Sequence, residues 1–129
     1  MKQKEKELLL KDLCGRLPYG VKCDINDNKP YTLSSISNDY DGILIRFKEQ
    51  KNGFNMEVYL SEVKPYLYPM SSMTKEQSKI YHELIGGMFG TSALINFEIL
   101  EEFFNKNHID YRGLIPMGLA NNATNLNIY

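Results

Sequence analysis

The chain has 129 residues, of which 43% are hydrophobic and 24% are charged, and its formal net charge is −1. This length and composition fit one folded domain over residues 1–129, and they exclude a disordered, highly charged tail. The balanced charge also argues against a surface that holds duplex DNA through many phosphate contacts.

The apolar runs and the two cysteines indicate the cellular compartment of the protein. No apolar run approaches the roughly 20 residues that a membrane span needs, and the apolar run 8–10 is too short for the core of a signal peptide. Cys14 and Cys23 are interpreted as reduced thiols, because a disulfide belongs mainly to secreted chains. We therefore predict a cytoplasmic protein that does not bind membranes.

The first elements follow from periodicity. Leucines recur at three- and four-residue spacing and predict a helix over residues 3–14, which Gly15 is expected to end. Alternating apolar and polar residues then predict strands at 21–25 and 31–36, separated by turn-forming residues.

The segment "GILIRFKEQKNGFNMEVYLSEV" is the strongest local signal and predicts a β-hairpin across residues 43–60. Asn52-Gly53 favours a two-residue turn, because both residues accept positive φ. With that turn, Phe47 pairs with Val58 on an apolar face. The polar face then pairs Arg46 with Tyr59 and Lys48 with Glu57.

Helices dominate the remainder of the chain. The sequence from Thr74 to Gln77 matches a capping box and predicts the start of a second helix. A third helix is expected from about Ser92, and its wide apolar arc predicts deep burial. Residues 111–120 fit a short helix or a turn, and 120–129 are interpreted as a flexible tail. The fold class is therefore α+β, with an N-terminal helix, an antiparallel meander of about four strands and two or three C-terminal helices. An SH3-like meander is one arrangement that fits.

The pattern of polar residues does not indicate an enzyme. His82 and His108 form no metal-binding spacing, and neither cysteine lies in a zinc or redox motif. We predict no catalytic residue, no metal and no cofactor. A small hydrolase that uses Asp39, Asp41 or His108 is the weakest alternative, because such carboxylates before a glycine usually form a solvated turn.

The stretch "VKPYLYPMSSMT" has two interpretations. Pro65 and Pro69 stiffen the backbone, so the segment fits a strap that packs aromatic residues on the core. The same segment fits a ridge that binds a partner protein, because tyrosine and methionine are enriched at interfaces. The residues of that ridge are Tyr66, Tyr68, Met70 and Met73.

A nucleic-acid-binding surface is the first alternative to a protein-binding one. Arg46, Lys48 and Tyr59 lie on the polar face of the predicted hairpin, where they would supply phosphate contacts and a stacking ring. Glu57 on the same face argues against this alternative.

Three segments resemble small uncharacterised proteins of gut Bacteroidales bacteria and of their phages and prophages: "KELLLKDLCGRLPYGVK", "VKPYLYPMSSMT" and "IDYRGLIPMGLA". The resemblance carries no activity and no site residue. It implies a phage or mobile-element context, in which accessory and anti-defence proteins are common. Taken with the residues, it leads us to predict a non-enzymatic module that binds a host or phage protein. A homodimer is one way to cover the apolar third helix.

Overall fold

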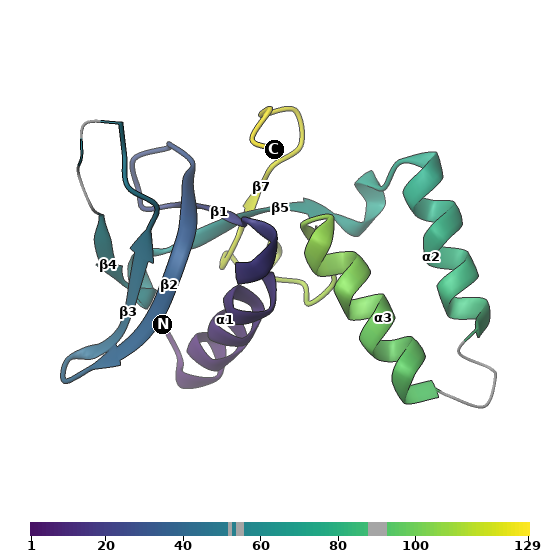
Figure 1. Cartoon of the computed structure of the whole chain (residues 1–129), viewed down its shortest axis with the longest axis horizontal. Helices are drawn as coiled ribbons and strands as arrows, with labels where there is room; N and C mark the ends of the chain where they lie inside the picture. The colour runs from purple at the N-terminus through teal and green to yellow at the C-terminus, as the bar shows by residue number, and fades with distance from the viewer. Residues whose placement is uncertain (52, 54–55, 88–92) are drawn as a thin grey trace.

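The structure is a computed structural model that describes every residue except 52, 54–55 and 88–92. It is mixed α+β, as the sequence predicts, with a helix before the sheet and two helices after the central strands (Figure 1). The helices are α1 (Gln3–Arg16), α2 (Lys75–Gly87) and α3 (Ala93–Lys106). The strands are β1 (Lys22–Asp24), β2 (Tyr31–Asp39), β3 (Gly42–Phe47), β4 (Glu57–Tyr59), β5 (Lys64–Pro69), β6 (Ile109–Asp110) and β7 (Asn121–Asn122). Short 3₁₀ turns are η1 (Leu17–Tyr19), η2 (Leu60–Glu62) and η3 (Met70–Ser72).

The described strands form a seven-stranded sheet, which is larger than the expected four. Its order is β4-β3-β2-β1-β5-β6, and β7 also pairs with β5. The strands up to β5 pair antiparallel, whereas β6 and β7 both run parallel to β5. The SH3-like arrangement is therefore not confirmed. Two-residue strands such as β6 and β7 show no alternation that a sequence pattern could reveal.

Helix α1 runs past Gly15, contrary to the sequence prediction. The chain leaves the helical region only at Gly20, which has φ 69° and follows η1. Gly15 has another role, because a Cβ atom there would lie 2.9 Å from Asn105 Nδ2. The glycine thus permits α1 and α3 to approach closely.

The β3–β4 hairpin forms, but its predicted register is wrong by two residues. Ile45 pairs with Val58 and Arg46 with Glu57, and the Gly53 N–H donates to the Gln50 carbonyl (2.9 Å), so the turn closes one residue earlier than the predicted Asn52-Gly53 turn. Gly53 has φ 78°, whereas Asn52 lies outside the described residues. A shift of two residues preserves the faces of a strand. Ile45 therefore stays buried, and Arg46 stays exposed with its Nε 3.0 Å from Glu57 Oε1.

Two hydrophobic clusters hold the molecule together. The larger cluster packs α1 against one face of the sheet, and the smaller one joins α2 and α3 to β6. In the larger, the fully buried residues include Leu9, Leu13, Val21, Cys23, Ile45, Leu67 and Leu114. The buried residues of the smaller are Leu100, Phe103, Phe104 and Ile109.

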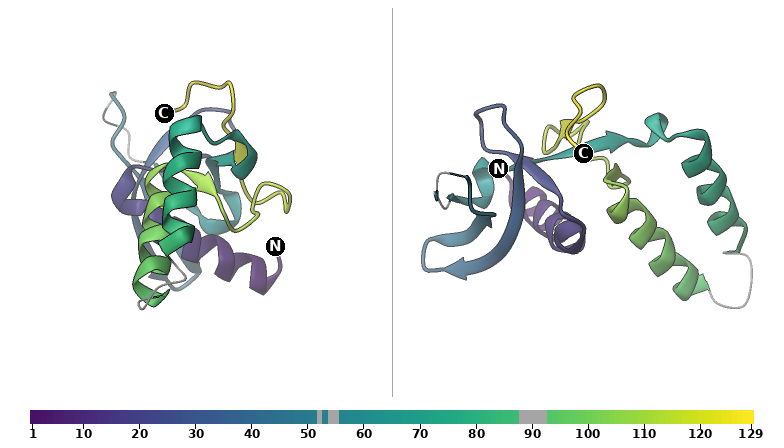
Figure 2. Two further views of the ribbon diagram at one scale, coloured as in Figure 1. Left: turned by 90° about the vertical axis from the view of Figure 1, so that its right-hand side faces the viewer. Right: turned by 45° about the horizontal axis from the view of Figure 1, so that its top comes forward.

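Helices α2 and α3 form an antiparallel hairpin that extends away from the sheet (Figure 2). The predicted capping box begins α2, since the Gln77 N–H donates to Thr74 Oγ1 (3.1 Å) and the Thr74 N–H donates to Gln77 Oε1 (3.0 Å). Ser92, the expected start of α3, lies outside the described residues. The expected deep burial of α3 is wrong near its N-terminus, where Phe97 is 50% exposed.

The segment expected to be a flexible tail, 120–129, makes specific contacts in the structure. Strand β7 pairs with Tyr66 and Leu67 of β5. The Lys22 N–H donates to the Tyr129 hydroxyl, which in turn donates to the Tyr66 carbonyl, each at 2.8 Å. The Tyr129 ring stacks on His108 with 3.7 Å between the centroids.

Candidate functional site

The proline- and tyrosine-rich stretch lies across the centre of the molecule as β5 and η3. Tyr66 is only 4% exposed, so most of its side chain is unavailable to a partner. Tyr68 is half-buried, and Met70 and Met73 are partly buried against the smaller cluster. These placements match the strap interpretation more closely than an exposed ridge. The stretch connects the sheet to the α2–α3 hairpin.

The polar face of β3 and β4 places Arg46, Lys48 and Tyr59 on the surface. Arg46 forms an ion pair with Glu57, and this pair neutralises the positive charge that a nucleic-acid phosphate would need. The negative charges of Asp39 and Asp41 raise the pKa of Tyr59. This acidic surrounding opposes the approach of a nucleic-acid backbone.

The three candidate hydrolytic groups do not meet. Asp39 and Asp41 lie at the β2–β3 turn, where the Asp41 N–H donates to Asp39 Oδ1 (2.6 Å) in a local turn contact. His108 precedes β6, which is separated from β2 in the sheet by β1 and β5. Its ring is buried under Tyr129, and desolvation, helped by Arg16 and Lys22, lowers its pKa to about 4. His82 is exposed on α2.

A buried ionic group joins α1 to the C-terminal half of the chain. The Arg16 guanidinium donates to Asp12 Oδ2 (2.9 Å) and to the carbonyls of Phe104 (3.3 Å) and Ile109 (2.6 Å). Burial raises the pKa of Asp12, against the opposing effect of Arg16. Asp12 and Arg16 are four residues apart on a helix. Ion pairs on the surface of a helix have the same spacing, so the spacing alone does not reveal that this pair is buried. We assign this ionic group a structural role, because the Arg16 guanidinium donates its hydrogen bonds to Asp12 and to two backbone carbonyls of the protein itself.

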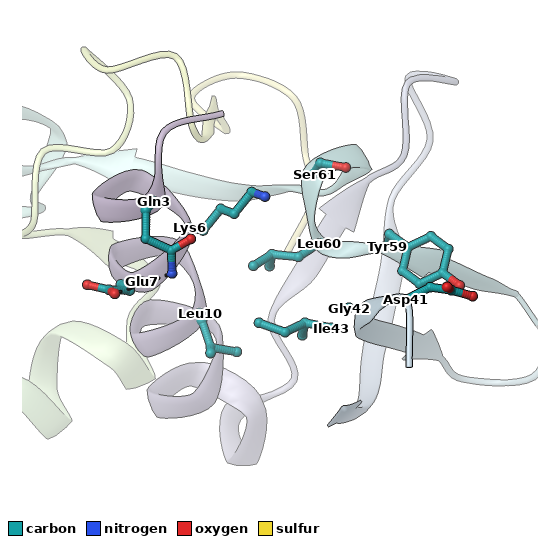
Figure 3. A pocket seen from close by; sticks show the side chains of 10 residues that line it. All are labelled: Gln3, Lys6, Glu7, Leu10, Asp41, Gly42, Ile43, Tyr59, Leu60 and Ser61. Carbon is teal, nitrogen blue, oxygen red and sulfur yellow. Dashed lines mark hydrogen bonds between the residues drawn. The ribbon is translucent and has the colours of Figure 1, made fainter. Parts of the chain in front are cut away.

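A small pocket of about 330 Å³ lies between α1 and the start of β3 (Figure 3). Its floor consists of Leu10, Ile43 and Leu60, and its charged rim of Lys6, Glu7 and Asp41. A small-molecule site usually adds positioned polar groups to an apolar floor. The three buried, unpartnered side-chain polar atoms found in the described residues belong to Asp12, Asn105 and His108, none of which lines this pocket.

A larger groove of about 560 Å³ runs between α2 and α3. Leu84 and Phe103 lie in it, and it also exposes Ile80 (39%) and Ile99 (41%). At one end, Gln77 Nε2 donates to Asn107 Oδ1 (3.4 Å), which joins α2 to the residue after α3. Ile80 on α2 and Ile99 on α3 thus give both walls of the groove partly exposed apolar side chains.

Charged residues border the groove on both helices. Glu76 contributes from α2, and Glu102 and Lys106 contribute from α3. Apolar floors with polar rims are the usual anatomy of a protein interface. The sequence signal for this site was the wide apolar arc of α3, although the arc alone did not show which part would stay exposed.

The described part of the chain offers neither a metal centre nor a membrane span. Within it, no three His, Cys, Asp or Glu side chains gather in a way that could hold a metal ion. Among those same residues, every helix is too short or too polar to cross a membrane. Comparisons with known protein families, curated proteins and solved structures give no match to the chain.

Proposed function

We propose that the protein is a non-enzymatic protein-interaction module that binds through the groove between α2 and α3. The observation that carries the proposal is the exposure of Ile80 and Ile99 beside Leu84 and Phe103. Because Ile80 is 39% and Ile99 41% exposed, a partner that covered either side chain would gain on the order of 1 kcal/mol. A helix of a partner protein suits the groove, because amphipathic helices lay an apolar face between two helices.

The resemblance to phage-borne proteins extends this proposal to its biological setting. The partner would be a host or phage protein, and the role would be accessory or anti-defence. Met70 and Met73, which follow β5, support binding at the helices, since both pack against the cluster at the base of the hairpin. The separation of Asp39 and Asp41 from His108 weighs against hydrolysis.

The test is affinity capture from a nuclease-treated host lysate with tagged protein and two variants. Ile99→Glu places a charge in the groove, and we expect it to abolish capture of any stoichiometric protein partner. Met117→Glu is the matched control, because Met117 is similarly exposed (46%) but lies outside the groove. Circular dichroism checks that both variants fold.

Two results would contradict the proposal. Equal capture by Ile99→Glu and wild type would place the binding surface elsewhere. Failure to capture protein, together with salt-sensitive binding of labelled single-stranded DNA, would favour the face of Arg46, Lys48 and Tyr59.

A further inference from the structure

We infer that the chain has a second binding site, a polar pocket beside the C-terminal segment, and that its ligand is a neutral saccharide. The β1–β2 loop, β5 and residues 121–128 line this pocket, which has a volume of about 810 Å³. That volume lies within the range of small-molecule sites. None of the described residues lines both this pocket and the α2–α3 groove, so the inference goes beyond the proposed function.

The register of the strands brings the floor of the polar pocket together. Asp24 pairs with Lys64 across β1 and β5, and Tyr66 pairs with Asn121 across β5 and β7. Lys64 and Tyr66 are two residues apart on β5, so the four side chains lie on one face of the sheet. Leu67, the next residue along β5, is fully buried on the other face in the larger cluster. The sheet thus has an apolar face towards α1 and a polar face towards the C-terminal segment.

The floor of the polar pocket is built from buried polar groups, which surface turns seldom contain. Asp24 is 6% and Tyr66 is 4% exposed. Asp24 Oδ1 accepts from the N–H groups of Asp27 (3.2 Å) and Asn28 (2.9 Å), and its Oδ2 accepts from Asn121 Nδ2 (3.1 Å). A carboxylate has about four acceptor positions, so these described donors leave one for a ligand.

The Tyr66 hydroxyl supplies a donor beside this acceptor. Burial and the charge of Asp24 raise the pKa of the Tyr66 phenol, so its hydroxyl keeps its proton. A small ligand, unlike a protein partner, needs to reach only the edge of such a buried side chain. The floor therefore offers both a donor and an acceptor to one ligand.

The rim of the polar pocket is rich in side-chain amides. Asn26, Asn28 and Asn127 line it, and all three are exposed. Each amide has two N–H donors and a carbonyl acceptor. A sugar hydroxyl also donates and accepts at once, so amides match neighbouring hydroxyls on a sugar ring. Leu126, which is 52% exposed, adds apolar surface for the C–H groups of the ring.

The charges of the polar pocket favour a ligand without net charge. Among the described residues, Asp24 and Lys64 are the charged side chains that line it, and their charges cancel. An anion would meet Asp24 and a cation would meet Lys64, so an ion of either sign meets a like charge. A neutral polyol avoids both repulsions and can use both groups as hydrogen-bond partners. A zwitterion also matches the two charges and is therefore the competing class of ligand.

The C-terminal wall of the polar pocket is held in place by the sheet. Lys22 Nζ donates to the Ile128 carbonyl (2.9 Å), and the Lys22 N–H donates to the Tyr129 hydroxyl (2.8 Å). Figure 1 shows the β1–β2 loop and the C-terminal segment on the same side of β1 and β5. A wall that is already ordered loses little conformational freedom when a ligand binds.

The test is titration of the ¹⁵N-labelled full chain with glucose, galactose, mannose and N-acetylglucosamine, followed by the chemical shifts of the backbone amides. We expect at least one sugar to cause saturable shifts that are confined to residues 24–30, 64–66 and 121–128. Raising the salt concentration from roughly 0.05 to 0.5 M should leave the dissociation constant unchanged, because a neutral ligand is not screened.

Two glycine variants give a matched comparison within the C-terminal segment. Asn127 (φ 53°) lines the polar pocket, whereas Asn125 (φ 65°) does not, and glycine accepts both left-handed conformations. Asn127→Gly removes an amide from the rim, so it should raise the dissociation constant about three- to tenfold. Asn125→Gly should leave the constant unchanged.

Three results would overturn the inference. The first is the absence of pocket shifts with all four sugars, and the second is an equal effect of Asn127→Gly and Asn125→Gly. The third is tighter binding of the zwitterion glycine, with a dissociation constant that rises with salt, which would assign the pocket to a charged ligand. The test of the α2–α3 groove with Ile99→Glu is independent of all three.

Discussion

At the scale of single residues, Arg16 is the charge on which the packing of α1 depends most. Its side chain is fully buried, and Arg16→Met would leave Asp12 as a buried charge without its closest partner. We expect this variant to lower the free energy of unfolding by about 3–5 kcal/mol. Arg46→Met is the control, because the Arg46–Glu57 pair is half-exposed and should contribute under about 1 kcal/mol. Urea denaturation measures both, and equal costs would contradict the structural role of Arg16.

His108 makes stability depend on pH. Burial lowers its pKa to about 4 in the folded state, below the ordinary 6.5. Between these values His108 binds more protons in the unfolded chain, so its contribution to the free energy of unfolding should fall as the pH drops from about 6.5 to 4. The loss should be on the order of 2 kcal/mol. His108→Asn, which tolerates the φ of 57°, should flatten this part of the profile. A slope that persists in His108→Asn would assign it to another group.

These residues also show what sequence reasoning reaches at this scale. The capping box of Thr74 and Gln77 was predictable because both partners lie within one turn of helix. The buried role of Arg16 was not, because its carbonyl partners, Phe104 and Ile109, are about 90 positions away. Hydrophobic periodicity reports on residues that are close in sequence, so it does not predict partners this far apart.

At the scale of elements, the contact of α1 with α3 depends on Gly15. Alanine favours a helix over glycine by about 1 kcal/mol, so Gly15→Ala would stabilise an uncrowded helix. Here the new Cβ would meet Asn105 Nδ2 at 2.9 Å, and we expect a net loss of about 1–2 kcal/mol. Adding Asn105→Ala should recover most of this loss.

The control for this prediction lies in α2. A Cβ atom added at Gly86 would meet no described atom within 4 Å beyond its chain neighbours and its own helix backbone, so Gly86→Ala should stabilise the protein slightly. Thermal denaturation of the single and double variants gives the comparison. Stabilisation by Gly15→Ala would mean that α1 and α3 are not in close contact.

The β3–β4 hairpin shows which features of an element a sequence determines. The alternation of Ile45, Arg46 and Phe47 predicted the buried and exposed faces correctly, because the period of two survives an even shift. The partners were wrong because the turn closes between Gln50 and Gly53, one residue earlier than a turn centred on Asn52-Gly53 would close.

At the scale of the whole molecule, the groove was only half predictable. The sequence identified α3 as apolar over a wide arc, but coverage of that arc depends on where α1, β6 and α2 lie. Strand β6 and helix α1 contact α3, and the buried residues of α3 in the smaller cluster, Leu100, Phe103 and Phe104, lie toward its C-terminal end. The N-terminal part of α3 and the outer helix α2 thus keep the exposed side chains Ile80, Phe97 and Ile99.

The C-terminal segment gives the last test, because its sequence suggests a flexible tail and its contacts suggest a clamp. Tyr129 joins β1, β5 and the turn before β6 through two hydrogen bonds and a ring stacked on His108. We expect Tyr129→Ala to cost about 2–3 kcal/mol of unfolding free energy, and Tyr129→Phe about 1 kcal/mol, because phenylalanine keeps the stack. Tyr40→Ala, at a fully exposed tyrosine in the β2–β3 turn, should cost nothing measurable. Urea denaturation of the three variants decides the matter, since a flexible tail would make Tyr129→Ala as harmless as Tyr40→Ala.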